Sequence, residues 1–179
     1  LVGSEMCIRD RNYATEVYRE KVATYLAGQG FNEMMTNSIT NAAYFSEEEL
    51  QSMVKMLNSL SSELNVLRNS LFETSLEVVA HNLNHKNNSL RLFEFGKSYS
   101  TSGSAKYNET ENLCITITGN KNEDNWKHKS NPSDFYFLQG TVDAVLKSLG
   151  ITPDTIEVVE VPKLDNHIAV SYTHLRAHE

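Results

Sequence analysis

Cysteine is scarce in this chain, and long hydrophobic runs are absent. With only two cysteines in 179 residues, the sequence excludes a disulfide framework and a cysteine-based zinc site. No apolar run approaches the roughly 20 residues that a membrane-spanning helix needs. The first residues also lack the charged, apolar and small-residue blocks of a signal peptide. We therefore expect a reduced, cytoplasmic setting and no membrane partner.

Basic residues are too few for a general nucleic-acid-binding protein. Acidic residues outnumber Lys and Arg by 23 to 16, which gives a formal net charge of −7. Affinity for nucleic acid comes largely from neutralising phosphates with a basic face. Any link with nucleic acid should therefore run through a partner protein or through segments outside this sequence. The content of hydrophobic residues, 40%, and of charged residues, 22%, is typical of one globular domain.

The two ends of the sequence differ in pattern from the rest. Residues 1–11 (LVGSEMCIRDR) and 170–179 (VSYTHLRAHE) have neither helical nor strand periodicity. They resemble the translated sequencing-adapter read-through found at the ends of metagenomic fragments. We predict that both ends are non-native, the alternative being ordinary frayed termini, and that residues 12–169 form one domain.

Helical and extended patterns alternate unevenly between these ends. Helices are expected up to Gly28 or Gly30, from Ser70 onward, and after Ser133 or Asp134, with short helical turns after Asn41 and Ser46. Extended segments are expected at residues 31–40, 53–57, 90–99, 113–119 and 155–161, with a hairpin tip at 100–108. Without regular βαβ spacing, this order predicts an α+β domain with a largely antiparallel sheet flanked by helices.

The clearest predicted helix begins at Ser70. Ser70 and Glu73 have the spacing of a capping box, in which each side chain accepts a hydrogen bond from the other residue's backbone N–H. An apolar stripe then follows at spacings of three and four residues. Its members are Phe72, Leu76, Val79, Ala80 and Leu83. The candidate structural or interface residues lie at the start of this helix and in the preceding turn and short strand. They are Glu63, Arg68, Asn69, Ser70 and Glu73.

Five stretches of the chain, in this order, carry a resemblance to a known family. They are YLAGQGFNE (25–33), NSLSSELNVLRNSL (58–71), NLN (82–84), LFEFGKSY (92–99) and DFYFLQG (134–140). Together they resemble the catalytic-like domain of bacterial phenylalanine–tRNA ligase beta subunits. One departure is that Ser59 stands where the family usually has proline, so a fixed φ is lost and the turn should be looser there.

The resemblance implies a degenerate class II aminoacyl-tRNA synthetase-like fold without an active site. The family's enzyme is an (alpha-beta)2 heterotetramer that joins phenylalanine to tRNA-Phe and uses ATP and magnesium. The alpha subunit catalyses the reaction, so the resemblance implies no catalytic residue and no cofactor in this chain. The implied partners are the alpha subunit and, through the whole complex, tRNA-Phe.

The positions of the arginines give an independent indication of inactivity. Forming an aminoacyl adenylate requires arginines that neutralise the triphosphate. In active class II enzymes one arginine follows the strand that corresponds to residues 93–99, and another follows a glycine-rich motif near the end. Here Ser100, Thr101 and Ser102 follow that strand, and no such motif occurs in residues 119–169. The sequence therefore predicts a non-catalytic domain.

Arg68 is the one arginine in a suggestive place. It could make a residual substrate contact, or it could bridge a strand and a helix or contact the alpha subunit. Because buried arginines are usually paired, we favour a structural role.

Other residues that suggest chemistry have simpler interpretations. His81 and His85 have the i, i+4 spacing of zinc ligands, but polar neighbours indicate a solvated helix face. Consecutive acids at residues 47–49 suit a helix N-terminus rather than a metal site. Trp126 with its basic neighbours could stack on a base, but on an acidic chain we expect instead that its loop packs onto the sheet. Cys114 is expected to be a small buried hydrophobe.

Two alternative functions stay open at this point. One is a self-sufficient class II-type enzyme that activates an amino acid. The other is an unrelated α+β interaction module whose likeness to the ligase is accidental.

Overall fold

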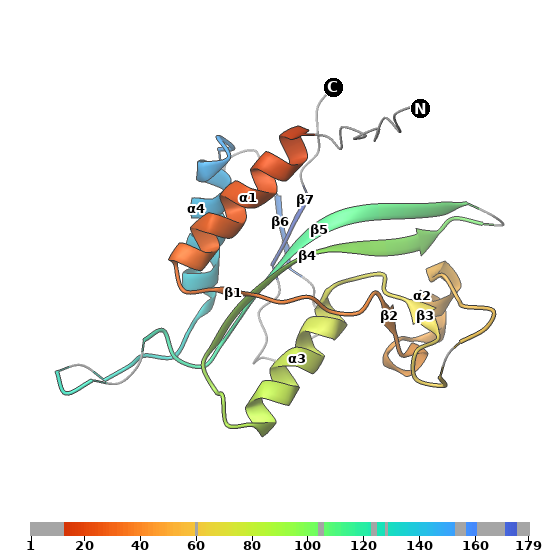
Figure 1. Cartoon of the computed structure of the whole chain (residues 1–179), viewed down its shortest axis with the longest axis horizontal. Helices are drawn as coiled ribbons and strands as arrows, with labels where there is room; N and C mark the ends of the chain where they lie inside the picture. The colour runs from red at the N-terminus through yellow and green to blue at the C-terminus, as the bar shows by residue number, and fades with distance from the viewer. Residues whose placement is uncertain are drawn as a thin grey trace, which may run out of the picture. The chain divides into compact units, whose positions relative to one another are not determined.

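A computed structural model (Figure 1) describes residues 13–59, 61–103, 106–122, 125–127, 129–152, 157–160 and 171–174. Contacts divide the chain into two units. One unit is Gly30–Leu138, and the other joins Leu1–Gln29 to Gln139–Glu179. The predicted non-native end at residues 1–11 lies outside the described residues, as does most of 170–179.

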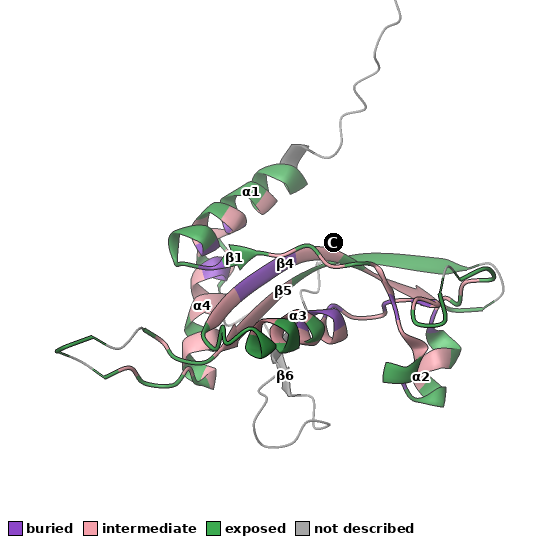
Figure 2. Ribbon diagram, turned by 60° about the horizontal axis from the view of Figure 1, so that its bottom comes forward, coloured by how far each residue is buried: buried purple, intermediate pink, exposed green. Residues whose placement is uncertain are grey.

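The unit Gly30–Leu138 is built on a long hairpin (Figure 1). Strands β4 (Leu90–Thr101) and β5 (Tyr107–Thr118) pair antiparallel along their full length, from Leu90 opposite Thr118 to Thr101 opposite Tyr107. Strand β1 (Asn32–Glu33) joins the other edge of β4 in parallel. Helix α3 (Phe72–Asn84) lies against one face of this hairpin, where Ser75 and Thr116 share a hydroxyl hydrogen bond of 2.7 Å (Figure 2).

A smaller cluster forms the rest of this unit. Strands β2 (Ile39–Thr40) and β3 (Val66–Leu67) pair antiparallel, and the short helices η1 (Ala42–Tyr44) and α2 (Glu47–Ser52) lie between them in sequence. Phe45, Met53 and Val66 make its buried apolar centre. Asn41 caps η1 as expected, because its side chain accepts from the Ala43 N–H.

The second unit contains helix α1 (Tyr13–Gly28) and, from Gln139 onward, helix α4 (Phe135–Ser148), which lie side by side (Figure 1). Val22 and Leu26 of α1 and Val145 and Leu146 of α4 are buried. Lys21 donates to the carbonyl of Ser148. The backbones of β6 (Glu157–Glu160) and β7 (Ser171–His174) pair antiparallel, so the predicted strand at residues 155–161 forms.

Both predicted ends of α4 are confirmed. The Asp134 carboxylate accepts from the Phe137 N–H at 2.9 Å, and hydrogen bonds from Lys121 and then from this N–H lower the pKa of Asp134. At the other end Gly150 has a φ of +80°, and its N–H donates to the Lys147 carbonyl. Glycine adopts that conformation at little steric cost, which is why it stops the helix there.

Two predicted strands are much shorter than expected. Of residues 31–40 only Asn32–Glu33 and Ile39–Thr40 are strands, and residues 53–57 contribute a single bridge from Lys55 to Val66. The reason lies in the backbone partners of residues 34–38. The Thr36 N–H donates to the Glu94 carboxylate at 3.2 Å. This group needs no sheet neighbour because a side chain satisfies it.

The predicted capping box at Ser70 and Glu73 is wrong. Helix α3 begins at Phe72, and its N-cap is Leu71, whose side chain makes no capping hydrogen bond. Ser70 accepts from the Phe72 N–H at 2.9 Å. Because Leu71 is buried and already helical in conformation, Ser70 lies one residue too early for the box. A complete box instead opens α2, between Ser46 and Glu49.

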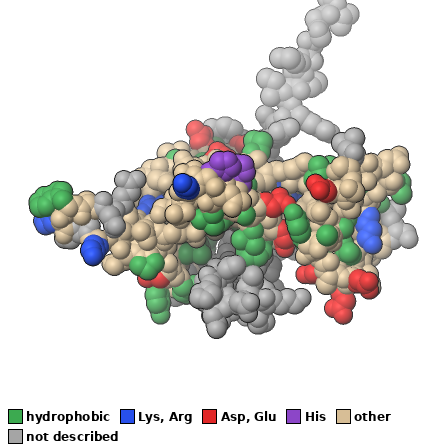
Figure 3. Space-filling model, turned by 90° about the horizontal axis from the view of Figure 1, so that it is seen from below, with side chains coloured by type: hydrophobic (Ala, Val, Ile, Leu, Met, Phe, Trp, Pro, Cys, Tyr) green, Lys and Arg blue, Asp and Glu red, His purple; other side chains and the backbone are tan. Residues whose placement is uncertain are grey.

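The apolar stripe predicted on α3 is only partly covered. Thr74 and Ser75 are the buried residues of this helix, whereas Leu83 is 42% exposed. The two buried positions of α3 can be polar because both side chains have hydrogen-bond partners. The Thr74 hydroxyl lies 3.4 Å from Arg68 Nη1, and the Ser75 hydroxyl lies 2.7 Å from that of Thr116. Apolar side chains thus remain at the surface, and the face in Figure 3 shows several hydrophobic ones among polar atoms.

The chain leaves helix α3 through Lys86, a position where glycine should be more stable than lysine. Lys86 has a φ of 66°, the left-handed conformation, while the Asn87 N–H donates to the Asn82 carbonyl. A non-glycine residue costs roughly 1 kcal/mol in that conformation. We predict that Lys86→Gly raises the free energy of unfolding by about 0.5–1 kcal/mol in urea denaturation. Asn87→Gly, at the next position, is the control. A loss of stability in Lys86→Gly would contradict this geometry.

Candidate functional site

The arginine that the sequence singled out is buried beneath the sheet hairpin. Arg68 follows β3 directly, and the residue is only 2% exposed. Its Nε donates to the Lys97 carbonyl at 2.9 Å, and its Nη1 lies 3.1 Å from Glu94 Oε1. Nη1 also lies 2.6 Å from the Thr36 hydroxyl and 3.4 Å from the Thr74 hydroxyl. The guanidinium thus joins β4 to α3 and to residues 34–38.

Glu94 of β4 completes this buried ion pair. The residue is 2% exposed, like Arg68. Its two carboxylate oxygens lie 2.9 and 2.7 Å from the Thr36 hydroxyl, and Oε1 also accepts from the Thr36 N–H at 3.2 Å. Two buried charges are tolerated only when paired and hydrogen-bonded. Both conditions are met, so the Arg68–Glu94 pair stabilises the interior of the domain and does not form an open binding site.

Gly96 leaves the space that the guanidinium needs. A Cβ at this position would overlap Arg68 Nη2, would lie 2.5 Å from Leu71 Cδ2 and would be 3.2 Å from Glu94 Oε1. The glycine in the stretch LFEFGKSY is therefore required by close approach of side chains. Its φ is not positive, so the constraint is one of space rather than of backbone conformation.

Cys114 lies on the same face of the sheet, next to the ion pair. Its register partner is Glu94, and its sulfur is 3.7 Å from the Thr116 hydroxyl. Burial raises the pKa of the thiol above its usual value. A protonated thiol is a poor nucleophile and a poor metal ligand. The residue is half-buried and packs as a small side chain.

The other predicted site residues do not gather around Arg68 into one polar site. Glu63 is exposed. Asn69 and Glu73 each bury one side-chain oxygen that has no hydrogen-bond partner within the described part of the chain. Sequence reasoning missed Glu94. Its position between Phe93 and Phe95, in a segment predicted to be a buried strand, could have indicated a buried carboxylate that needs a cationic partner.

An acidic pocket of about 250 Å³ lies near Glu63. Its lining is Asn37, Ile39, Thr40, Asn41, Tyr44, Glu63, Leu64, Thr74 and Glu77. The hydrogen bond to Glu77, together with that group's charge, raises the pKa of the Tyr44 hydroxyl. Carboxylates repel anions, so this lining disfavours a nucleotide phosphate.

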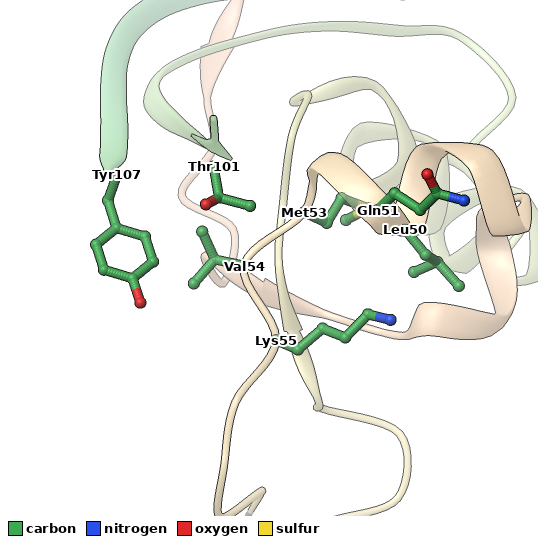
Figure 4. Close-up of a pocket in the computed structure, with 7 residues that line it drawn as sticks. All are labelled: Leu50, Gln51, Met53, Val54, Lys55, Thr101 and Tyr107. Carbon is green, nitrogen blue, oxygen red and sulfur yellow. The ribbon is translucent and has the colours of Figure 1, made fainter. Parts of the chain in front are cut away.

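A second, more open pocket of about 300 Å³ lies beside α2 (Figure 4). Its lining is Leu50, Gln51, Met53, Val54, Lys55, Thr101 and Tyr107. Lys55 is the only charged side chain among them, and neither pocket is lined by arginine or glycine. Neither therefore offers the arginine clamp or the backbone cradle that holds a triphosphate.

The remaining candidates lie at the surface. His81 of α3 and His85, the C-cap residue of that helix, are exposed with ring centroids 4.4 Å apart. No group of three or more His, Cys, Asp or Glu side chains within the described ranges could hold a metal ion. The expectation that the Trp126 loop packs onto the sheet is wrong, because Trp126 is 96% exposed. None of the helices in the part of the chain described has the length and apolarity to cross a membrane.

Comparison with known proteins gives a consistent result. Residues 7–172 match the family "Phenylalanyl tRNA synthetase beta chain CLM domain". The phenylalanine–tRNA ligase beta subunit of Bacteroides thetaiotaomicron is 40% identical over 161 residues, which are 84% of this chain and 20% of that protein. The Bacillus subtilis beta subunit is 30% identical over 154 residues, 83% of this chain and 19% of that protein. The chain thus spans about a fifth of the length of the curated relatives.

Solved structures support the expected fold. Pyrrolysyl-tRNA synthetase from Desulfitobacterium hafniense aligns with a TM-score of 0.62 at 19% identity, covering 92% of this chain and 60% of that one. An ATP phosphoribosyltransferase regulatory subunit/histidyl-tRNA synthetase from Bacillus halodurans C aligns with a TM-score of 0.57 at 17% identity, covering 80% and 35%. The α+β fold is therefore that of class II synthetase catalytic domains, as the sequence predicted.

Proposed function

The chain belongs to the phenylalanyl-tRNA synthetase beta chain family, and from this premise we propose that it is a non-catalytic, structural domain that packs against the catalytic alpha subunit. The parent complex would be an (alpha-beta)2 ligase of the cytoplasm that charges tRNA-Phe with phenylalanine. In this proposal ATP and magnesium are bound by the parent complex, and the present domain needs no cofactor of its own.

The observation that carries this proposal is the burial of Arg68. Activating an amino acid with ATP requires cations that face the triphosphate. The arginines in the described part of the chain are Arg19, Arg68 and Arg91. Arg68 is sealed against Glu94, Arg91 donates to the Lys121 carbonyl, and Arg19 lies 3.8 Å from Glu16. This arrangement supports a domain whose charges hold the fold together instead of binding substrate.

Exposed apolar side chains support a protein partner. Large hydrophobic residues at the surface of the described residues are Val17, Tyr18, Met35, Tyr44, Leu57, Leu83, Tyr107, Leu113, Trp126 and Tyr136. Leu57 is fully exposed and Met35 is 95% exposed. Exposed apolar side chains of this size are the ones that most often contribute to contacts with another protein.

Co-expression with an alpha subunit tests the partner. We expect this chain and the alpha subunit of Bacteroides thetaiotaomicron, the species of a 40% identical beta subunit, to elute together in size-exclusion chromatography with light scattering. Desulfitobacterium hafniense pyrrolysyl-tRNA synthetase, which shares the fold at 19% identity, is the control and should elute separately. A folded chain that stays monomeric beside the alpha subunit would refute the proposal.

A self-sufficient amino-acid-activating enzyme is the rival. No observation favours it, because neither pocket is lined by an arginine and the one next to Glu63 is acidic. Family membership removes the other alternative, an unrelated interaction module.

A further inference from the structure

Two carboxylates of the acidic pocket have no cationic partner. Glu63 and Glu77 line this pocket of about 250 Å³, and both residues are exposed. Neither belongs to any ion pair among the described residues. No basic side chain lines the pocket. A cation that enters it would therefore meet negative charge that nothing else compensates.

Both carboxylates act on the same hydroxyl group. The hydrogen bond to Glu77, then the charge of Glu77 and, more weakly, the charge of Glu63 raise the pKa of the Tyr44 hydroxyl. Glu63 precedes β3 in the chain, whereas Glu77 lies on α3. The fold thus brings two acids from different segments to one pocket.

The buried residue Thr40 adds a hydroxyl that lacks a partner. Thr40 lines the same pocket and is 3% exposed, and its Oγ1 has no hydrogen-bond partner in the described part of the chain. Its backbone pairs with Val66 of β3, and its carbonyl accepts from the Asn65 N–H at 3.2 Å. The side chain is therefore the part of Thr40 left for a molecule in the pocket. Because a buried hydroxyl without a partner is unfavourable, an occupant with an N–H donor would satisfy it.

We infer that the acidic pocket binds a primary ammonium group, carried by a small amine or by a lysine side chain of the alpha subunit. An ammonium group has three N–H donors, and the pocket offers the Thr40 hydroxyl and the Glu63 and Glu77 carboxylates as acceptors. Pockets for drug-sized ligands begin at roughly 300 Å³, so this smaller one suits a single side chain or an amine of a few carbon atoms. Only the lysine source depends on the function proposed above, because a free amine would bind the chain alone.

A metal ion fits the pocket less well. Two carboxylates and a hydroxyl are fewer oxygen ligands than the roughly six to eight that Ca²⁺ takes, and the described ranges contain no group of His, Cys, Asp and Glu side chains that could hold a metal ion. Arg68 lies 3.4 Å from the Thr74 hydroxyl, but it does not line the pocket and is paired with Glu94. The two carboxylates of the pocket therefore keep their charge for an incoming cation.

Titration of the ¹⁵N-labelled chain with n-butylammonium chloride tests the site. We expect saturable shifts of the Thr40, Glu63 and Glu77 amide signals in ¹H–¹⁵N NMR spectra, with a dissociation constant on the order of 1 mM because exposed ion pairs are weak. Tetramethylammonium chloride carries the same charge without an N–H donor, so it should bind at least about 5-fold more weakly. Equal affinity for the two ions, or no saturable shift with n-butylammonium, would overturn the inference.

Matched variants separate the pocket from the rest of the acidic surface. Thr40→Val removes the hydroxyl and should weaken n-butylammonium binding about 10-fold, the loss of one hydrogen bond to a charged group. It should not lower the urea midpoint, because this hydroxyl has no partner in the free chain as described. Glu63→Gln with Glu77→Gln should also weaken binding about 10-fold. Glu48→Gln, which removes an exposed acid of α2 outside the pocket, should leave the affinity unchanged. Unchanged affinity in Thr40→Val would reject the site.

The alpha subunit of Bacteroides thetaiotaomicron distinguishes the two sources of the ammonium group. If the source is a lysine of that subunit, adding the subunit should displace n-butylammonium, and Glu63→Gln with Glu77→Gln should weaken the complex about 10-fold. If the source is a small amine, n-butylammonium should bind the complex and the chain alone equally well. Absence of any complex would refute the proposed function, whereas saturable binding of n-butylammonium to the chain alone would still support the ammonium site.

Discussion

Arg68→Met should cost about 3–5 kcal/mol of folding free energy, the typical loss when one partner of a buried ion pair is removed. The variant leaves the Glu94 carboxylate buried at 2% exposure without its cation. It also removes the donor to the Lys97 carbonyl, which ties β3 to β4. Because a typical domain is stable by only about 5–15 kcal/mol, urea denaturation followed by circular dichroism should show a much lower midpoint.

A double variant provides the control for this prediction. In Arg68→Met with Glu94→Leu both charges are gone, and apolar replacements of buried pairs are often neutral or stabilising. We therefore expect the double variant to recover at least about 2 kcal/mol relative to Arg68→Met. If the two variants were equally unstable, the loss would come from packing rather than from an uncompensated charge.

Gly96→Ala should cost about 2–4 kcal/mol, since overpacking alone typically costs 1–3 kcal/mol and here it displaces a paired guanidinium. The new methyl group would overlap Arg68 Nη2 and Leu71 Cδ2. Leu71 is buried, and Arg68 is held by Glu94, Thr36 and the Lys97 carbonyl, so neither side chain can move away without losing its contacts.

Gly140→Ala is the matched control in thermal and urea denaturation. Gly140 lies within α4, and a Cβ there would have no heavy atom within 4 Å. Alanine is favoured over glycine in a helix interior by about 1 kcal/mol, so this variant should gain stability. A Gly96→Ala protein as stable as the wild type would show that the guanidinium is not confined as described.

Short sequence patterns correctly predicted those helix ends and strands that depend on residues close together in the sequence. Asp134 and Gly150 bound α4 as expected because a cap and a left-handed glycine act within a few residues. The β-branched run at 113–119 lies mostly in β5, and the alternating segment at 90–99 lies in β4. Both strands extend into the predicted hairpin tip at 100–108, because the backbone pairing of the two strands continues to Thr101 opposite Tyr107 although residues 107–113 are exposed.

The errors arise where distant residues decide the structure. The Ser70–Glu73 pair has the spacing of a capping box, but burial of Leu71 sets the first turn of α3 one residue later. The partner of Arg68 is 26 residues away in sequence, and no local pattern specifies that distance. The exposure of Trp126 was missed for the same reason, since tryptophan is usually covered and only the tertiary structure shows that nothing in the described unit covers it.

The central claim is that the buried Arg68–Glu94 pair stabilises a domain without catalytic activity. The most direct test of this claim is to measure amino-acid-dependent ATP–pyrophosphate exchange by the isolated chain. The account predicts exchange at the level of a no-enzyme blank with phenylalanine and with every other standard amino acid, in a chain shown by circular dichroism to be folded. Exchange above that blank would contradict the account, most clearly if Arg68→Lys, which preserves the charge, abolished it while the chain stayed folded.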